Sequence, residues 1–153
     1  MDRSVYQTSP ADVSGRRPLA ELSIPVLWGD LDALGHVNNT RFLRFIEELR
    51  VIWFNSLGDG WMTENLSPIV ANINCNFSRP IHWPATVSVD LCASWSGGKS
   101  ITLSHEIRDA DDPAVLYADA TVVLVWVDRQ TGRAAELPRQ VTRQVDGLVN
   151  SDH

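Results

Sequence analysis

The chain has 153 residues, which suffices for one domain with a substantial hydrophobic core. Hydrophobic residues make up 44% of it and charged residues 21%, as in ordinary soluble globular proteins. The net charge of -6, with only 13 Lys plus Arg, excludes a general nucleic-acid-binding surface. No apolar run reaches the roughly 18 residues of a membrane span, so we expect no membrane insertion.

The two cysteines, Cys75 and Cys92, match no zinc or redox spacing. Each lies within an apolar run, which favours reduced, buried thiols and a cytoplasmic location. The histidines form no metal-binding motif, so we expect no metal.

The first segments in chain order are a polar stretch, a short strand and a loop. Residues 1–19 are rich in Ser, Pro, Asp, Arg and Gly without periodicity, which predicts a disordered lead-in. Residues 21–28 predict a strand, in which Pro25 is acceptable only at a sheet edge or a bulge. Residues 29–37 contain two glycines and two aspartates and predict a loop. We expect residues 20–153 to form a single domain.

A long amphipathic helix follows the loop. From Asn38 or Asn39 to Leu57, apolar residues recur with the period of 3.6 that indicates a helix. Asn38 and Asn39 are candidate N-caps, and Gly58 stands where a helix-terminating glycine is expected. The apolar stripe comprises Phe42, Phe45, Ile46, Leu49, Ile52, Trp53 and Leu57.

The rest of the chain alternates with the period of two that indicates strands. His105 falls on an apolar strand face, which favours a core histidine. The last run is apolar on both faces, which predicts burial on both sides. The strands are predicted at residues 69–78, 86–95, 101–108 and 115–127, with a weak terminal helix at 138–148.

The order of these elements is strand, long helix and four strands. It predicts an α+β fold in which one helix covers one face of a curved antiparallel sheet of five strands. The alternating strands leave a second sheet face that needs cover, which a partner subunit could supply.

The loop before the helix carries the most informative motif. Residues 28–39 read Trp-Gly-Asp-Leu-Asp-Ala-Leu-Gly-His-Val-Asn-Asn. This run resembles the D-x-D-x-x-G-H-V-N-N signature of hotdog-fold thioesterases, above all the 4-hydroxybenzoyl-CoA thioesterase-like and acyl-ACP thioesterase-like groups. The likeness covers roughly residues 21–138. It implies a hotdog fold, with one long helix wrapped by the curved sheet, and hydrolysis of an acyl-CoA to a free acid and coenzyme A.

The resemblance also implies catalytic residues. Asp32 matches the catalytic carboxylate, as nucleophile or general base, and the backbone N–H of Asn39 matches the group that polarises the thioester carbonyl. The chemistry is consistent, because attack on a thioester builds negative charge that a helix N-terminus can stabilise. His36 is a third candidate, either orienting substrate or water or bonding backbone at the helix entry.

Other roles remain open at the level of sequence. Asp32 could instead close an Asx turn, and Asp30 is the predicted turn former of the pair. The side chain of Asn38 is a cap or a substrate ligand. In the resembling enzymes basic residues bind coenzyme A phosphates, which makes Arg79 and the Lys99-Ser100 pair candidate substrate-binding residues or plain solvated strand ends.

The resemblance has departures and alternatives. Leu34 stands where plant acyl-ACP thioesterases have Asn, and His36 replaces an apolar residue of the hydroxybenzoyl-CoA type. The departure at Leu34 favours acyl-CoA over acyl-ACP, and the departure at His36 means that the acyl group cannot be copied from the hydroxybenzoyl-CoA type. We expect no cofactor besides the coenzyme A of the substrate, and self-association as a dimer or a tetramer of dimers. A hotdog hydratase or dehydratase and a non-catalytic acyl-CoA-binding module are the alternatives.

Overall fold

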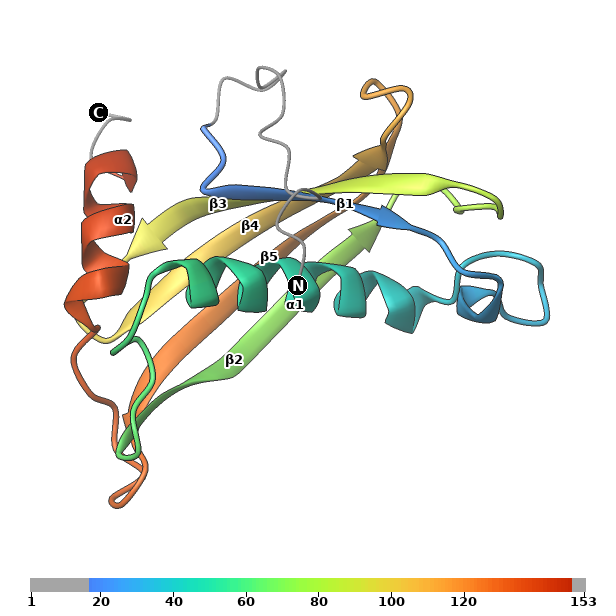
Figure 1. Cartoon of the computed structure of the whole chain (residues 1–153). Coiled ribbons are helices and arrows are strands. Elements are labelled where there is room, and N and C mark those ends of the chain that lie inside the picture. The colour runs from blue at the N-terminus through green and yellow to red at the C-terminus, as the bar shows by residue number, and fades with distance from the viewer. Residues whose placement is uncertain (1–16, 150–153) are drawn as a thin grey trace.

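The structure is a computed structural model that describes residues 17–149. Figure 1 shows one curved antiparallel sheet with a long helix, α1, lying across one face. The sheet order is β1-β3-β4-β5-β2. The predicted α+β fold with five strands is therefore confirmed. The elements are β1 (Ala20–Pro25), η2 (Trp28–Asp30), α1 (Asn39–Ser56), β2 (Leu66–Phe77), β3 (Thr86–Ser96), β4 (Ser100–Asp109), β5 (Leu116–Asp128) and α2 (Arg139–Val149).

The ends of the chain are only partly described. Of the predicted lead-in at 1–19, residues 1–16 lie outside the described residues, as do the last residues of the predicted domain, 150–153. Leu19 already donates its N–H to the carbonyl of Leu91 at 2.7 Å, so pairing with the sheet begins within the predicted lead-in.

Helix α1 starts and ends where its capping residues predict. The Asn38 side chain accepts a hydrogen bond from the N–H of Thr40, and Gly58 adopts a φ of 79° after the last turn. Each fully buried apolar side chain of the stripe contributes about 1.5–3 kcal/mol through burial. Those buried are Phe42, Phe45, Ile46, Leu49 and Trp53, while Ile52 and Leu57 are partly buried.

Strand β1 is shorter than predicted. Pro25 is its last residue and β1 is an edge strand, which confirms the expectation for this proline. The predicted continuation to Trp28 is wrong, because Trp28–Asp30 forms a 3-10 turn. The N–H of Leu27 donates to the Asp30 carboxylate at 2.8 Å, and this local bond ends the extended conformation.

A β-bulge corrects the predicted alternation of β2. Val70 pairs with Leu124 and Asn72 pairs with Val123, so Ala71 is an extra residue. Beyond the bulge the faces exchange, and Val70 shares the inner face with Ile73, Cys75 and Phe77. We call these four residues, Val70, Ile73, Cys75 and Phe77, the β2 apolar row.

In the remaining strands, the side chains on the sheet face that α1 covers are the buried ones. His105 is buried, with Nδ1 at 2.8 Å from the Asp90 carbonyl, which confirms a core histidine. The prediction that the last strand is buried on both sides is wrong for the chain that the structure describes. Its inner side chains, such as Leu124, are buried, whereas outer ones, such as Val125, are half-buried, because α1 covers one face (Figure 1).

The C-terminal helix α2 confirms the predicted terminal helix, shifted by one residue. It packs against β3, with Val141 and Val145 buried. Neither α1 nor α2, the two α-helices within residues 17–149, is long and apolar enough to cross a bilayer.

Candidate active site

The loop between β1 and α1 is held in shape by its own backbone. The N–H of Asp32 donates to the His36 carbonyl at 2.9 Å, and the N–H of Gly35 donates to the Asp32 carbonyl at 3.0 Å. Gly35 has a φ of 78°, a conformation that glycine adopts without steric penalty. Leu31 and Val37 pair across the neck of the loop. The motif thus folds into a tight turn that brings Asp32 to the start of α1.

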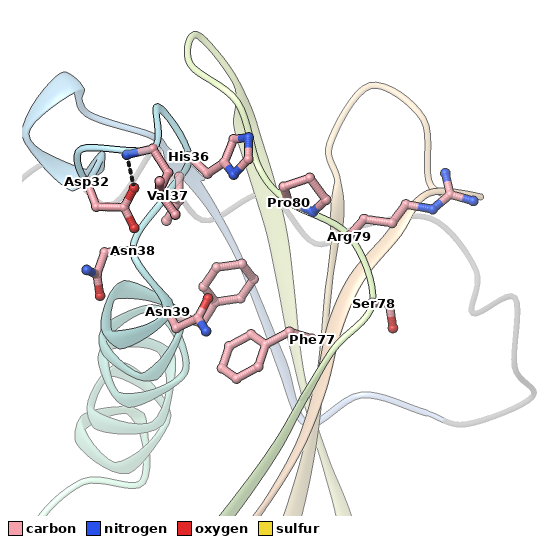
Figure 2. Close-up of a pocket in the computed structure, with 11 residues that line it drawn as sticks. Asp32, His36, Val37, Asn38, Asn39, Phe77, Ser78, Arg79 and Pro80 are labelled. Atoms are coloured by element: carbon pink, nitrogen blue, oxygen red, sulfur yellow. Dashed lines mark hydrogen bonds between the residues drawn. The ribbon is translucent and has the colours of Figure 1, made fainter.

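Asp32 divides its carboxylate between the turn and the pocket. Oδ1 accepts the N–H of Leu34 at 2.9 Å, which is the Asx turn considered from the sequence. Oδ2 accepts no hydrogen bond from any residue that the structure describes, and Asp32 lines the pocket. Figure 2 shows the carboxylate on the side of the loop that faces the start of α1. The structural and the chemical interpretation of Asp32 are therefore compatible.

The first residue of α1 presents an unused backbone donor. The N–H of Asn38 donates to the Asp30 carbonyl at 2.9 Å, and the N–H of Thr40 donates to the Asn38 side chain at 2.9 Å. Asn38 is therefore the cap, although it also lines the pocket. Within residues 17–149 the intervening N–H of Asn39 has no acceptor, as expected at the first position of a helix.

One pocket, of about 390 Å³, collects most of the predicted site residues. Its polar end is formed by the loop between β1 and α1. Its apolar wall contains Phe42 and Phe77, whose rings meet edge to face at 5.1 Å. The N–H of Val37 donates to the Ile81 carbonyl at 2.9 Å and holds the two sides together. The lining residues are Asp32, Leu34, His36, Val37, Asn38, Asn39, Phe42, Phe77, Ser78, Arg79 and Pro80.

His36 has an aromatic partner that the sequence did not reveal. Its ring lies edge-on to the ring of His82, with 4.8 Å between centroids. His82 belongs to the segment between β2 and β3 and carries no spacing signal relative to the motif. No group of three potential metal ligands gathers anywhere in residues 17–149.

The candidate phosphate-binding residues do not all lie at the pocket. Arg79 lines it, and its exposed guanidinium points away from Asp32 (Figure 2). Lys99 and Ser100 follow the far end of β3, which starts at the pocket end with Thr86. Eleven residues of strand span roughly 35 Å, so neither Lys99 nor Ser100 reaches this pocket within the chain.

The backbone that carries Arg79 is clamped by Tyr117. The carbonyl of Tyr117 accepts the N–H of Ser78 at 2.8 Å and that of Arg79 at 3.2 Å. The Tyr117 hydroxyl donates to Asp109 at 2.6 Å. Burial, together with this bond, raises the pKa of Tyr117 to about 12. The clamp was not predicted, because its residues come from three separate strand ends.

Asp30 has a larger role than the turn former that its position predicts. Its side chain is 5% exposed, and its carboxylate contacts Arg41 and Arg44 of α1. A buried acid in a loop between two glycines has no sequence signature, because burial is decided by the packing of α1 over the loop.

Comparisons with known proteins show the family to which the chain belongs. Residues 26–145 match the family model of the thioesterase-like superfamily. The chain is 34% identical over 123 residues to the long-chain acyl-CoA thioesterase FadM of Escherichia coli, covering 78% of this chain and 91% of FadM.

Solved structures show the same fold. The PA2801 protein of Pseudomonas aeruginosa superposes with a TM-score of 0.78 at 35% identity, covering 83% of this chain and 98% of that one. Slr0204 of Synechocystis, a 1,4-dihydroxy-2-naphthoyl-CoA thioesterase, superposes with a TM-score of 0.76 at 20% identity, covering 87% and 97%, and supports the fold alone. The chain therefore belongs to the thioesterase-like superfamily and has its hotdog fold.

Proposed function

We propose that the protein hydrolyses acyl-CoA thioesters to free acids and coenzyme A, with Asp32 and the start of α1 as its catalytic groups. One observation carries the proposal: a carboxylate oxygen and a backbone N–H, both without partners among the described residues, border the same pocket. Membership of the thioesterase-like superfamily and the named activity of FadM support it.

The proposed reaction begins with the thioester carbonyl oxygen accepting the N–H of Asn39. The positive end of the α1 dipole stabilises the negative charge that develops there. Asp32 Oδ2 then attacks the carbonyl carbon, the carbon–sulfur bond breaks, and coenzyme A leaves as a thiolate; water hydrolyses the resulting anhydride. Alternatively, Asp32 takes a proton from a water that attacks directly. Neither route needs a cofactor, because a thiolate is a good leaving group.

His36 and Arg79 complete the proposed substrate site. His36 lines the pocket beside Asp32 and can orient the attacking water or the acyl group. Arg79 is exposed at the rim, where its charge can meet a coenzyme A phosphate.

We propose long-chain acyl groups as the first substrates to test. FadM is named for long-chain acyl-CoA. The apolar wall at Phe77 continues along the β2 apolar row to Val70, and an extended alkyl chain could follow it.

We also propose that the working unit is a homodimer joined at the β2 edge. Val70, Ile73 and Phe77 of the β2 apolar row are 44%, 39% and 45% exposed on an edge strand. An exposed apolar edge invites pairing with another strand. Antiparallel pairing of β2 with its copy places the partner's far sheet end beside this pocket. Lys99 and Ser100 would then serve the site of the other protomer, in a dimer or in a tetramer of dimers.

The reducing cytoplasm remains the proposed location. Cys75 and Cys92 are not joined in a disulfide, as a reducing compartment favours.

The experiment follows thiol release from short, long and aromatic acyl-CoAs. We expect turnover by the wild-type protein, and a fall in kcat of at least about 10²-fold in Asp32→Asn. Asparagine keeps an oxygen for the N–H of Leu34, so the loop should keep its shape. Equal rates for the two proteins would contradict the proposal. Hydration of crotonyl-CoA in place of hydrolysis would support the hydratase alternative, and binding without turnover the binding module.

A further inference from the structure

Asp30 is a buried acid that the proposed chemistry does not use. Its carboxylate accepts the N–H of Leu27 at 2.8 Å. Arg44 Nη2 lies 3.3 Å from Oδ1 and 3.5 Å from Oδ2, and Arg41 Nε lies 3.6 Å from Oδ1. A carboxylate on a side chain that is 5% exposed needs such charged partners, because burial of an unpaired charge is strongly unfavourable.

These contacts connect the two parts of the candidate site. Leu27 lies at the β1 end of the loop that carries Asp32, whereas Arg41 and Arg44 belong to the first two turns of α1. The Asp30 backbone adds a third connection, because its carbonyl accepts the N–H of Asn38, the helix cap, at 2.9 Å. Asp30 is therefore bonded to the strand side of the loop, to the cap and to the body of the helix.

The positive charge at the start of α1 explains why the Asp30 carboxylate is needed there. The first turn of α1 contains no acidic residue, and Arg41 lies within it. A cation at this end is disfavoured by the helix dipole, which itself carries about half a positive charge there. Asp30 supplies, from outside the helix, the negative charge that the first turn lacks. Without its charge, Arg41 would lose this carboxylate partner, Arg44 would keep only Glu48 as an acidic partner, and the start of α1 would be held less firmly to the loop.

We propose that Asp30 is a positioning residue for the hydrolysis described above, and the inference rests on that proposed function. Asp30 fixes the start of α1 against the loop, so that Asp32 Oδ2 and the N–H of Asn39 converge on one carbonyl. It touches neither substrate nor reacting atoms. A misplacement of about 1 Å between catalytic groups can reduce a rate about 10²-fold while binding persists.

The test separates catalysis from binding in Asp30→Asn. Asparagine still accepts the N–H of Leu27 but loses the charge that holds the arginines. We expect kcat to fall about 10–100-fold. KM, and the Kd of a ketone analogue with a methylene between sulfur and carbonyl, should stay within about threefold, because the groups that bind substrate remain.

Three variants make the test specific. Glu48→Gln neutralises the other acidic partner of Arg44 and should leave kcat unchanged. Arg44→Gln should reproduce part of the loss, and Arg44→Lys should restore part of it. The double variant Asp30→Asn/Arg44→Gln should lose less than the product of the single losses, because both substitutions break one interaction. If Asp30→Asn does not fold, Arg44→Gln alone decides, with an expected loss of at least about fivefold in kcat.

The outcomes distinguish this inference from the proposed function. Folded Asp30→Asn with wild-type kcat, beside an inactive Asp32→Asn, would overturn the inference and leave the proposed function standing. Parallel changes in kcat and in the Kd of the analogue would also overturn it, because they indicate general disruption of the site. If the wild-type protein shows no turnover, the proposed function is contradicted, and the proposed role of Asp30 falls with it.

Discussion

Two groups at the start of α1 are of different chemical kinds, and this allows them to be tested separately. Asp32 is proposed to act through its side chain, whereas Asn39 is proposed to act through its backbone N–H. A side-chain substitution at position 39 therefore should leave the chemistry intact, unless the substitution removes the N–H itself.

Proline is the substitution that removes it. Asn39 is the first residue of α1, where proline is well tolerated, and Asn38 has the extended φ and ψ of -60° and 137° that proline requires of its predecessor. We expect Asn39→Pro to fold and to lose about 10²–10³-fold in kcat, the usual effect of losing one oxyanion donor. Asn39→Ala keeps the N–H and should retain most of the activity. Equal activity of Asn39→Pro and Asn39→Ala in steady-state assays would exclude the backbone donor.

Local chemistry explains why these residues could be predicted and others could not. The cap at Asn38 and the turn at Gly35 depend on neighbouring residues, so the loop could be predicted from the sequence. His82 and Tyr117 reach the site through long-range pairing, and the burial of Asp30 depends on how α1 packs over the loop. None of these leaves a local pattern.

At the scale of elements, the bulge at Ala71 decides which side chains of β2 face the helix. An alternation of period two cannot reveal an inserted residue, because both faces of this strand carry apolar side chains near the bulge. The strand was predicted, but the unbroken alternation along it was wrong at the bulge. The helix was predicted almost to the residue, because its caps and its stripe agree.

The β2 apolar row predicts that a charge placed in it weakens self-association, and the adjacent residue provides a matched control. Ile73 and Asn74 are adjacent, but Ile73 faces inward with Val122 and Asn74 faces outward with Thr121. We expect Ile73→Lys to shift the protein toward monomer in sedimentation velocity, because it places a charge in the proposed interface. Asn74→Lys should leave the sedimentation coefficient unchanged. A dimer that tolerates Ile73→Lys would refute an interface on this face.

The Tyr117 clamp gives a prediction about pH. Because its folded-state pKa is raised from 10.0 to about 12, its contribution to the free energy of unfolding is complete below pH 10 and is lost as pH rises toward 12. The difference in free energy of unfolding between wild type and Tyr117→Phe should therefore shrink over that range in urea titrations. A difference that stays constant from pH 8 to pH 11.5 would show that the hydroxyl titrates normally.

At the scale of the whole molecule, the length of the sheet separates Lys99 from the pocket in the same chain. The resemblance made this residue a candidate for binding the substrate's phosphates, and a two-fold dimer is the simplest way to reconcile that candidate role with the distance. The sequence could not reveal this arrangement, because a residue's distance from the site depends on strand direction and on assembly.

Mixed dimers test the exchange of residues between protomers. Equal amounts of Asp32→Asn and Lys99→Ala, refolded together, should regain about a quarter of the wild-type kcat/KM, because half the dimers are mixed and each then holds one intact site. Each variant alone should have low kcat/KM. No gain on mixing would mean that Lys99 serves its own protomer or no site at all.

The central claim concerns a single geometry, in which a carboxylate and a backbone donor act on one carbonyl. It is tested most directly by a crystal structure of the wild-type protein with the ketone analogue of a long-chain acyl-CoA. We predict the analogue's carbonyl oxygen about 3 Å from the backbone N of Asn39 and its carbonyl carbon about 3–3.5 Å from Asp32 Oδ2, or one water further away. A carbonyl bound elsewhere, or one reached by neither group, would contradict the account.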